Sequence, residues 1–151
     1  MSLPSQRLAE LGVALPPVAS PVGSYVPAIR RGDTVQTSGQ IPFTADGLIT
    51  GLVGSQVDVG AAQGAARVSA LNALAAAADA AGGIDAVKGI VKVTVFVASA
   101  PGFTEQAAVA NGASDVLAEI FGAEGRHIRS AVGVAVLPGN ASVEVELVAR
   151  L

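Results

Sequence analysis

The alternation of apolar and polar residues is clearest over residues 127–151, where it predicts two β-strands joined by the turn formers Pro138-Gly139-Asn140. In the first run the apolar parity consists of Ile128, Val132, Val134 and Val136, and the other of His127, Arg129, Ala131, Gly133 and Ala135. In the second run the apolar parity consists of Val143, Val145, Leu147, Ala149 and Leu151, and the other of Glu144, Glu146 and Arg150. Because side chains alternate between the faces of a strand, each run has one apolar face and one face of charges and small residues.

An antiparallel hairpin of these two runs must place like faces together, since a slip of one residue would turn one strand inside out. The predicted register pairs Val136 with Val143. It also places Glu144 opposite Ala135, six positions from Arg129, which is a separation of about 20 Å along the strand. We therefore expect Arg129 and Glu144 to share a site only if a second copy of the chain supplies one of them.

The remaining pattern predicts helices and strands in alternation. From the N-terminus the expected elements are a short amphipathic helix over 2–12, an extended proline-rich segment over 15–23, strands over 25–29 and 33–40, a loop over 43–54, a helix over 58–81, a strand over 89–98 and a helix over 104–120. Asp58 or Ser55 is the expected cap of the long helix and Thr104 that of the following one. The long helix is expected to bury a stripe of Val68, Leu71, Leu74, Ala75 and Ala78.

This order, β-β-α-β-α-β-β after an N-terminal helix, predicts an α+β sandwich with both main helices on one face of the sheet. Residues 1–22 form an N-terminal extension and residues 23–151 a single domain in this interpretation. The other face carries Arg129, Glu144 and Glu146 among small residues. It is too apolar to remain in water, so we expect it to be an interface between subunits.

Composition narrows the possible functions. The chain has 151 residues, of which 51% are hydrophobic and 3% aromatic, and a net charge of −3. A core of small residues favours close backbone packing over a large ligand cavity, and the scattered basic residues form no stripe for nucleic acid. Without cysteine, a signal-peptide pattern or an apolar run long enough to span a bilayer, the expectation is a soluble cytoplasmic protein.

Few residues offer chemistry. One histidine and no cysteine give no basis for a zinc site, and no phosphate-binding or serine-nucleophile motif is present. His127 is best interpreted as a strand-start residue. Arg129 could grip a carboxylate bidentately while Glu144 or Glu146 moves a proton from water. The alternative is a structural ion pair between Arg129 and a glutamate across a subunit contact.

Several segments, in order along the chain, resemble the Rid (YjgF-type) family, which is also catalogued as endoribonuclease L-PSP. They are Tyr25 in Gly-Ser-Tyr-Val, Thr37-Ser-Gly-Gln-Ile-Pro42, Val91-Lys-Val-Thr-Val-Phe-Val97, Arg129-Ser-Ala-Val, Leu137-Pro138 and Val143-Glu-Val-Glu146. The resemblance implies a chorismate-mutase-like fold and a homotrimer with clefts between subunits, with no cofactor or metal.

The resemblance also implies a reaction, in which Arg129 holds the carboxylate of a 2-imino or 2-enamino acid and Glu144 positions the hydrolytic water. Tyr25 and the backbone near Gly39 line the cleft, and the products are a 2-keto acid and ammonia. The arginine and the glutamate come from neighbouring chains in this family.

Three positions depart from the family's pattern. Many deaminating members have cysteine where this chain has Ala131 and a larger residue where it has Gly133. The asparagine of the second helix corresponds to Ser114 without gaps, or to Asn111 after a shift. Two alternatives to a deaminase therefore stay open. One is a trimer that binds or regulates through small carboxylates without turnover; the other is RNA cleavage, which the acidic charge disfavours.

Overall fold

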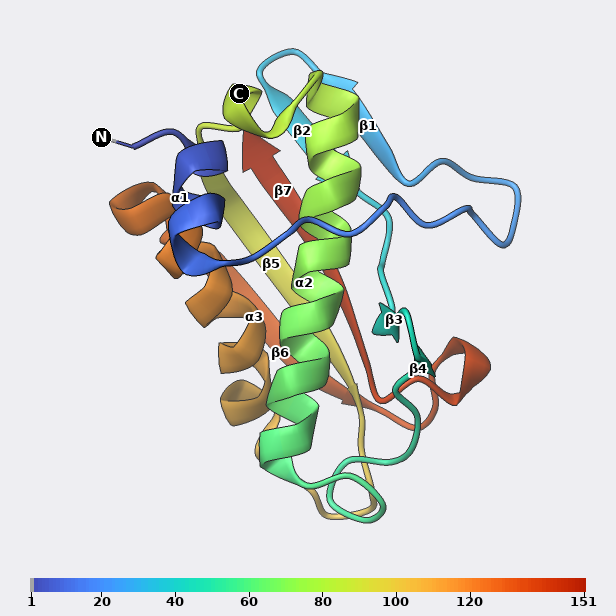
Figure 1. Ribbon diagram of the computed structural model, residues 1–151. Helices are drawn as coiled ribbons and strands as arrows, with labels where there is room; N and C mark the ends of the chain where they lie inside the picture. The colour runs from blue at the N-terminus through green and yellow to red at the C-terminus, as the bar shows by residue number, and fades with distance from the viewer. Residues whose placement is uncertain (1) are drawn as a thin grey trace.

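Five strands form one mixed sheet in the order β1-β2-β7-β5-β6 (Figure 1). The computed structural model describes residues 2–151. The strands are β1 (Ala28–Arg31), β2 (Thr34–Thr37), β5 (Gly89–Ala98), β6 (Ile128–Val134) and β7 (Val143–Arg150). Two long helices, α2 (Val59–Ala81) and α3 (Gln106–Phe121), cover one face of the sheet, and α1 (Pro4–Leu11) packs beside α3 (Figure 1). The predicted α+β architecture is confirmed.

The shorter elements are β3 (Phe43–Thr44), β4 (Gly47–Leu48) and the single 3₁₀ turns η1 (Ile84–Ala86), η2 (Gly122–Gly125) and η3 (Pro138–Asn140). The segment 43–54, expected to be only a loop, therefore contains a short antiparallel hairpin of β3 and β4. Within residues 2–151 no helix is long and apolar enough to cross a membrane.

Helix α2 begins and ends as its sequence predicts, and its predicted buried stripe is confirmed in part. The Asp58 side chain accepts a hydrogen bond from the amide of Ala61 at 2.7 Å, and Gly82 ends the helix with φ of 90°. Of the expected buried stripe, Leu74, Ala75 and Ala78 are buried, whereas Val68 and Leu71 are only half-buried. The fully buried face consists mainly of small residues: Ala62, Ala65, Ala66, Ser69, Ala70, Ala73 and Ala77. Small side chains occupy these positions because the backbone of α2 lies very close to α3 and to the sheet.

The closest approach is between α2 and α3, where the Cα of Gly112 lies against the carbonyl of Gln63. A side chain at residue 112 would collide with that backbone, so the helix pair depends on this glycine. The buried stripe predicted for α3 is confirmed, since Val109, Ala113, Val116, Leu117 and Ile120 are all buried. The predicted Thr104 cap is wrong, because α3 begins at Gln106 and Glu105 occupies the cap position without a side-chain bond.

The predicted hairpin of the last two strands is wrong, because β5 lies between them. Strand β6 pairs parallel with β5, with Val93 opposite Arg129, and β7 pairs antiparallel with β5, with Phe96 opposite Glu144. The expected pairing of Val136 with Val143 does not form. Strand β5 is apolar and long, and its position between β7 and β6 satisfies its backbone on both sides. The turn at Pro138–Asn140 forms as predicted, but it joins strands that are not neighbours.

The faces of β6 are also opposite to the prediction. Ile128 is 67% exposed and Val132 44% exposed on the open face, which no helix covers. Ala131 instead packs against the main core, and Arg129 turns toward α3. Arg129 therefore does not share the open face with Glu144 and Glu146, as the alternation had suggested.

The N-terminal segment packs closely against the rest of the chain. Leu8 is buried in the main core, Arg7 donates from Nε to the carbonyl of Glu119 at 2.8 Å, and Ser5 binds both oxygens of Asp85. The Ser5 hydroxyl and amide hold the pKa of the Asp85 carboxyl below its usual value. The proposed boundary at residue 22 stays a prediction.

Candidate active site in two halves

Arg129 on β6 is held by the neighbouring helix. Its Nη1 donates to Oδ1 of Asn111 at 2.8 Å and to Oγ of Ser114 at 3.1 Å, and its Nη2 donates to the carbonyl of Ala107 at 3.3 Å. A guanidinium carries five N–H groups. The Nε–H and one Nη2–H therefore have no hydrogen-bond partner among residues 2–151, and two such donors suit bidentate binding of a carboxylate.

Both helix residues that the sequence left as alternatives contact Arg129. Ser114 and Asn111 lie one turn apart on α3, so a single guanidinium nitrogen bonds to both. Ser114 is also 2.8 Å from Nε2 of His127, whose Nδ1 is 2.6 Å from the carbonyl of Gly125. The sequence interpretation of His127 as a strand-start residue missed this network, because the alignment of α3 with β6 is a tertiary feature.

Glu144 lies on the open face of the sheet, beside Gly39. A Cβ at residue 39 would lie 2.5 Å from Oε1 of Glu144, so only glycine leaves room for this carboxylate. Burial raises the pKa of the Glu144 carboxyl, and the charge of Glu146 raises it further. A half-buried carboxylate with a raised pKa is a stronger base than an exposed one, which favours proton transfer from water.

Tyr25 stands on the same side of the molecule as Gly39. Both line a small cavity of about 40 Å³, together with Val22 and Phe43. Tyr25 is 47% exposed, and its hydroxyl accepts a long hydrogen bond of 3.4 Å from the amide of Val22. The structure thus places Tyr25, Gly39 and Glu144 in one region and leaves the aromatic ring accessible to a ligand.

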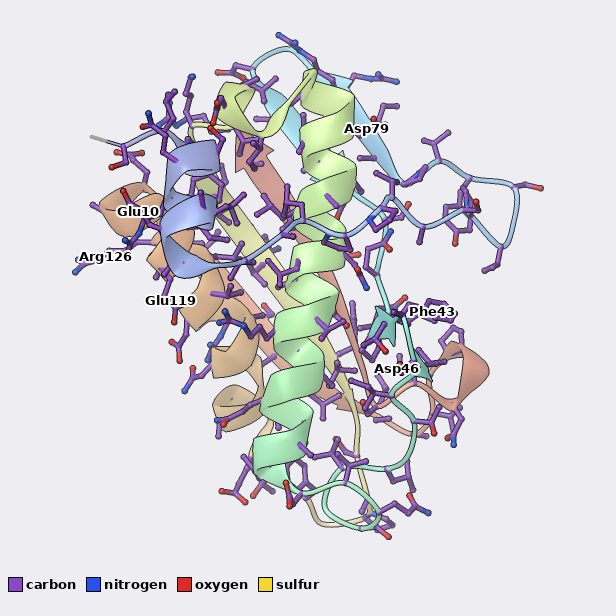
Figure 2. All side chains as sticks on the ribbon, viewed as in Figure 1. Glu10, Phe43, Asp46, Asp79, Glu119 and Arg126 are labelled. Carbon is purple, nitrogen blue, oxygen red and sulfur yellow. The ribbon has the colours of Figure 1, made fainter. Side chains whose placement is uncertain are left out.

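The two halves are separate within one chain. Arg129 faces α3, whereas Glu144 lies on the opposite face of the sheet, two strands away. Along the strand direction the two residues are three positions apart, and across the sheet they are two strands apart. Together these offsets separate their Cα atoms by roughly 14 Å. Figure 2 shows Phe43, which lines the Tyr25 cavity, on the opposite side of the molecule from Arg126, the near neighbour of Arg129 in sequence. One chain cannot bring both groups to one small ligand, although the predicted distance of about 20 Å was too long.

Two of the three positions that depart from the family's pattern, Ala131 and Gly133, do not open a void. Ala131 packs against the core. A Cβ at Gly133 would lie 2.8 Å from Nε2 of Gln106 and 3.0 Å from Oγ of Ser99, so these side chains fill the space beside the glycine. Gln106 is held there by bonds to Ser99 and to the carbonyl of Phe103. No sequence motif indicated Gln106, because only the packing of α3 on β6 brings it to Gly133.

No group of three or more His, Cys, Asp or Glu side chains that could hold a metal ion occurs within residues 2–151. The candidate site contains a guanidinium, a glutamate, an aromatic hydroxyl and backbone groups. The protein is therefore of the α+β class, with Arg129 on the helix-covered face of the sheet and Glu144 on the open face.

The chain belongs to the family described as "YjgF/chorismate_mutase-like, putative endoribonuclease", whose model matches residues 5–151. It is 46% identical over 147 residues to protein TCP17 of Trypanosoma cruzi, covering 96% of this chain and 92% of that protein. It is 30% identical over 136 residues to the 2-iminobutanoate/2-iminopropanoate deaminase of Dermatophagoides farinae, covering 89% of this chain and 91% of that enzyme.

Solved structures share the fold. The protein Atu1372 of Agrobacterium tumefaciens, described as having unknown function, superposes with a TM-score of 0.89 at 43% identity, covering 98% of this chain and 92% of that one. The structure of E. coli TdcF with bound serine has a TM-score of 0.64 at 33% identity, covering 91% and 94% of the two chains. Serine carries a free carboxylate, and so does the substrate in the name of the mite enzyme.

Proposed function

We propose that this protein is a hydrolytic deaminase of small 2-imino and 2-enamino acids, acting at clefts between the subunits of a homotrimer. The observation that carries the proposal is the free edge of Arg129, where Nε–H and one Nη2–H remain available while α3 holds the other donors. The family's imine deaminase at 30% identity supports the same substrate class.

The proposed reaction divides the work between two chains. Arg129 of one subunit holds the carboxylate. Glu144 of the next takes a proton from water as the oxygen bonds to C2, and passes this proton to the imine nitrogen as the C=N π bond breaks. In the resulting carbinolamine, Glu144 takes the hydroxyl proton as the C2=O bond forms and delivers it to the nitrogen as the C2–N bond breaks, so ammonia and a 2-keto acid leave. The raised pKa of Glu144 suits it to both proton transfers. The Tyr25 ring shapes the cleft.

A shared cleft follows from the separation of the halves. Arg129 and Glu144 lie on opposite faces of one sheet, so a site containing both needs a second copy of the chain. The exposed apolar side chains of Ile128 and Val132 give the open face a surface suited to such a contact.

The direct test generates 2-iminobutanoate in situ with an amino-acid oxidase, traps it with semicarbazide and adds the protein. Wild-type protein should lower the yield of the semicarbazone, whereas Arg129→Ala and Glu144→Gln should not. Glu10→Gln, at an exposed position on α1, is the matched control for the loss of one carboxylate. If wild type competes with trapping no better than Arg129→Ala, these substrates are not hydrolysed.

A mixing experiment tests the shared cleft. When inactive Arg129→Ala and Glu144→Gln chains are unfolded together and reassembled, one interface in four combines an intact arginine with an intact glutamate, so about a quarter of wild-type activity should return. If both residues act from the same chain, no activity returns. Light scattering on the wild type gives the subunit number, and a stable monomer would contradict the model.

The non-catalytic alternative makes a different prediction from the same variants. Under that hypothesis Glu144→Gln leaves the binding of 2-oxobutanoate intact, and wild type shows binding without hydrolysis. The deaminase hypothesis is favoured because the Glu144 carboxyl is partly buried and has a raised pKa. A surface that only binds a carboxylate does not need a group of this kind.

A further inference from the structure

A chain of hydrogen bonds lies behind Arg129, on the side away from its free donors. It runs from the carbonyl of Gly125 to Nδ1 of His127 at 2.6 Å, from Nε2 of His127 to Oγ of Ser114 at 2.8 Å, and from Ser114 to Nη1 of Arg129 at 3.1 Å. His127 follows η2, Ser114 lies on α3 and Arg129 lies on β6. The hydrogen bonds therefore connect these three elements.

The direction of each bond follows from its end points. A carbonyl only accepts, so Nδ1 of His127 carries a proton and, in the neutral ring, Nε2 accepts. The Ser114 hydroxyl then donates to Nε2, and its lone pairs face the guanidinium, which only donates. This arrangement gives every group in the chain a partner of the right kind.

We propose that Ser114 and His127 are positioning residues, which set the orientation of Arg129 and thereby the affinity of the site for a carboxylate. The proposal rests on the proposed function only in taking Arg129 as the carboxylate anchor. Neither Ser114 nor His127 touches the free edge of the guanidinium, so neither is assigned a catalytic role.

The histidine matters because a serine hydroxyl rotates freely. Without the acceptor at Nε2 of His127, the Ser114 proton has no fixed partner and can turn toward Nη1 of Arg129, which is itself a donor. The hydroxyl would then oppose the guanidinium instead of accepting from it, and Arg129 would lose one of the bonds that orient it. His127 prevents this by accepting the serine proton.

The test is a double-mutant cycle with 2-oxobutanoate, the keto acid that the proposed reaction forms from 2-iminobutanoate, as the binding probe. Ser114→Ala and His127→Ala should each raise the Kd by about 2- to 10-fold, as expected for one hydrogen bond. If His127 acts only through Ser114, the double variant binds no more weakly than Ser114→Ala alone. Additive effects, or an unchanged Kd in Ser114→Ala, overturn the proposal.

Two further variants exclude a general loss of structure. His127→Gln places an amide oxygen near the position of Nε2 and should restore most of the affinity that His127→Ala loses. Ser55→Ala, in an exposed loop, loses a hydroxyl elsewhere and should bind as wild type does. If His127→Gln binds as weakly as His127→Ala, the acceptor at Nε2 is not what matters and the proposal fails.

A readout without ligand or turnover separates this proposal from the deaminase. His127 is the only histidine, so a long-range ¹H–¹⁵N spectrum contains one imidazole. In the neutral ring we expect the proton on Nδ1 and a bare Nε2, and a shift of the Nε2 signal in Ser114→Ala. The opposite tautomer overturns the positioning chain, whatever the outcome of the deaminase assay. If hydrolysis is absent but this tautomer and the binding cycle hold, only the proposed reaction fails.

Discussion

The Cα of Gly39 lies directly against the side chain of Glu144, and a Cβ at residue 39 would lie 2.5 Å from Oε1 and 2.7 Å from Cδ of that glutamate. Gly39 precedes the bridge in which Gln40 pairs with Val145, so the strand segments are fixed on both sides of the contact. The glutamate therefore occupies space that any other residue at position 39 would need.

Gly39→Ala should displace the Glu144 carboxylate and lower kcat by about 10- to 100-fold, as a shift of about 1 Å does in other active sites. The carboxylate lies at the surface end of a flexible side chain, so it can move, and the melting temperature should fall little. Gly64→Ala, in a helical position with open space around it, is the control and should leave kcat unchanged. Equal activity of Gly39→Ala and wild type would show that the position of Glu144 is not critical.

Glu144→Gln should make the protein more stable at neutral pH. The folded-state pKa of Glu144 is raised above its ordinary value, so the folded chain binds the proton more tightly than the unfolded chain does. Ionised Glu144 therefore lowers the free energy of unfolding. This destabilisation has its full size above the folded-state pKa of Glu144 and disappears as the pH falls below the ordinary pKa of a glutamate. Melting temperatures of variant and wild type should therefore differ at pH 7 and converge in acid.

Glu146→Gln should move the acid limb of the kcat/KM profile to lower pH. The charge of Glu146 is the second cause of the raised pKa of Glu144, so its removal lowers that pKa and lets the base ionise in more acidic solution. A profile measured with 2-iminobutanoate checks the shift. A limb that stays in place would mean that Glu144 does not control it.

Gly112→Ala should destabilise the fold. A Cβ at residue 112 would collide with the carbonyl of Gln63, and backbone in the middle of a helix cannot turn away as a side chain can. The expected loss is about 1–3 kcal/mol in the free energy of unfolding, measured by urea denaturation. Gly64→Ala should instead be neutral or stabilising, by up to about 1 kcal/mol, because it removes glycine from an open helical position.

Val132→Asp should weaken the assembly and the activity together. Val132 is 44% exposed on the open face, which it shares with the more exposed Ile128, and a charge there opposes burial against another subunit. Leu3→Asp, at an exposed position near the N-terminus, is the control for an added charge. A Val132→Asp variant that keeps the wild-type size in light scattering would remove this face from the interface.

Local signals were enough to predict most elements. The cap at Asp58, the stop at Gly82 and the β-branched run of β5 gave their bounds to within a residue, because these features act through neighbouring backbone. The buried face of α2 could not be predicted in the same way. Ala62, Ala65 and Ala66, rather than Val68, are the fully buried residues. The reason is that the close approach of α2 to α3 favours the smallest side chains, and that approach depends on Gly112.

The sequence by itself determined the α+β order, the alternation along the last two strands and the residue types of the candidate site. Only the tertiary structure decided that β5 separates β6 from β7 and that Arg129 faces α3 while Glu144 faces the open side. Alternation divides a strand into two faces but does not say which face the helices cover. On β6 the larger side chains Ile128 and Val132 face away from the helices, because the small residues Ala131 and Gly133 are what α3 and Gln106 leave room for.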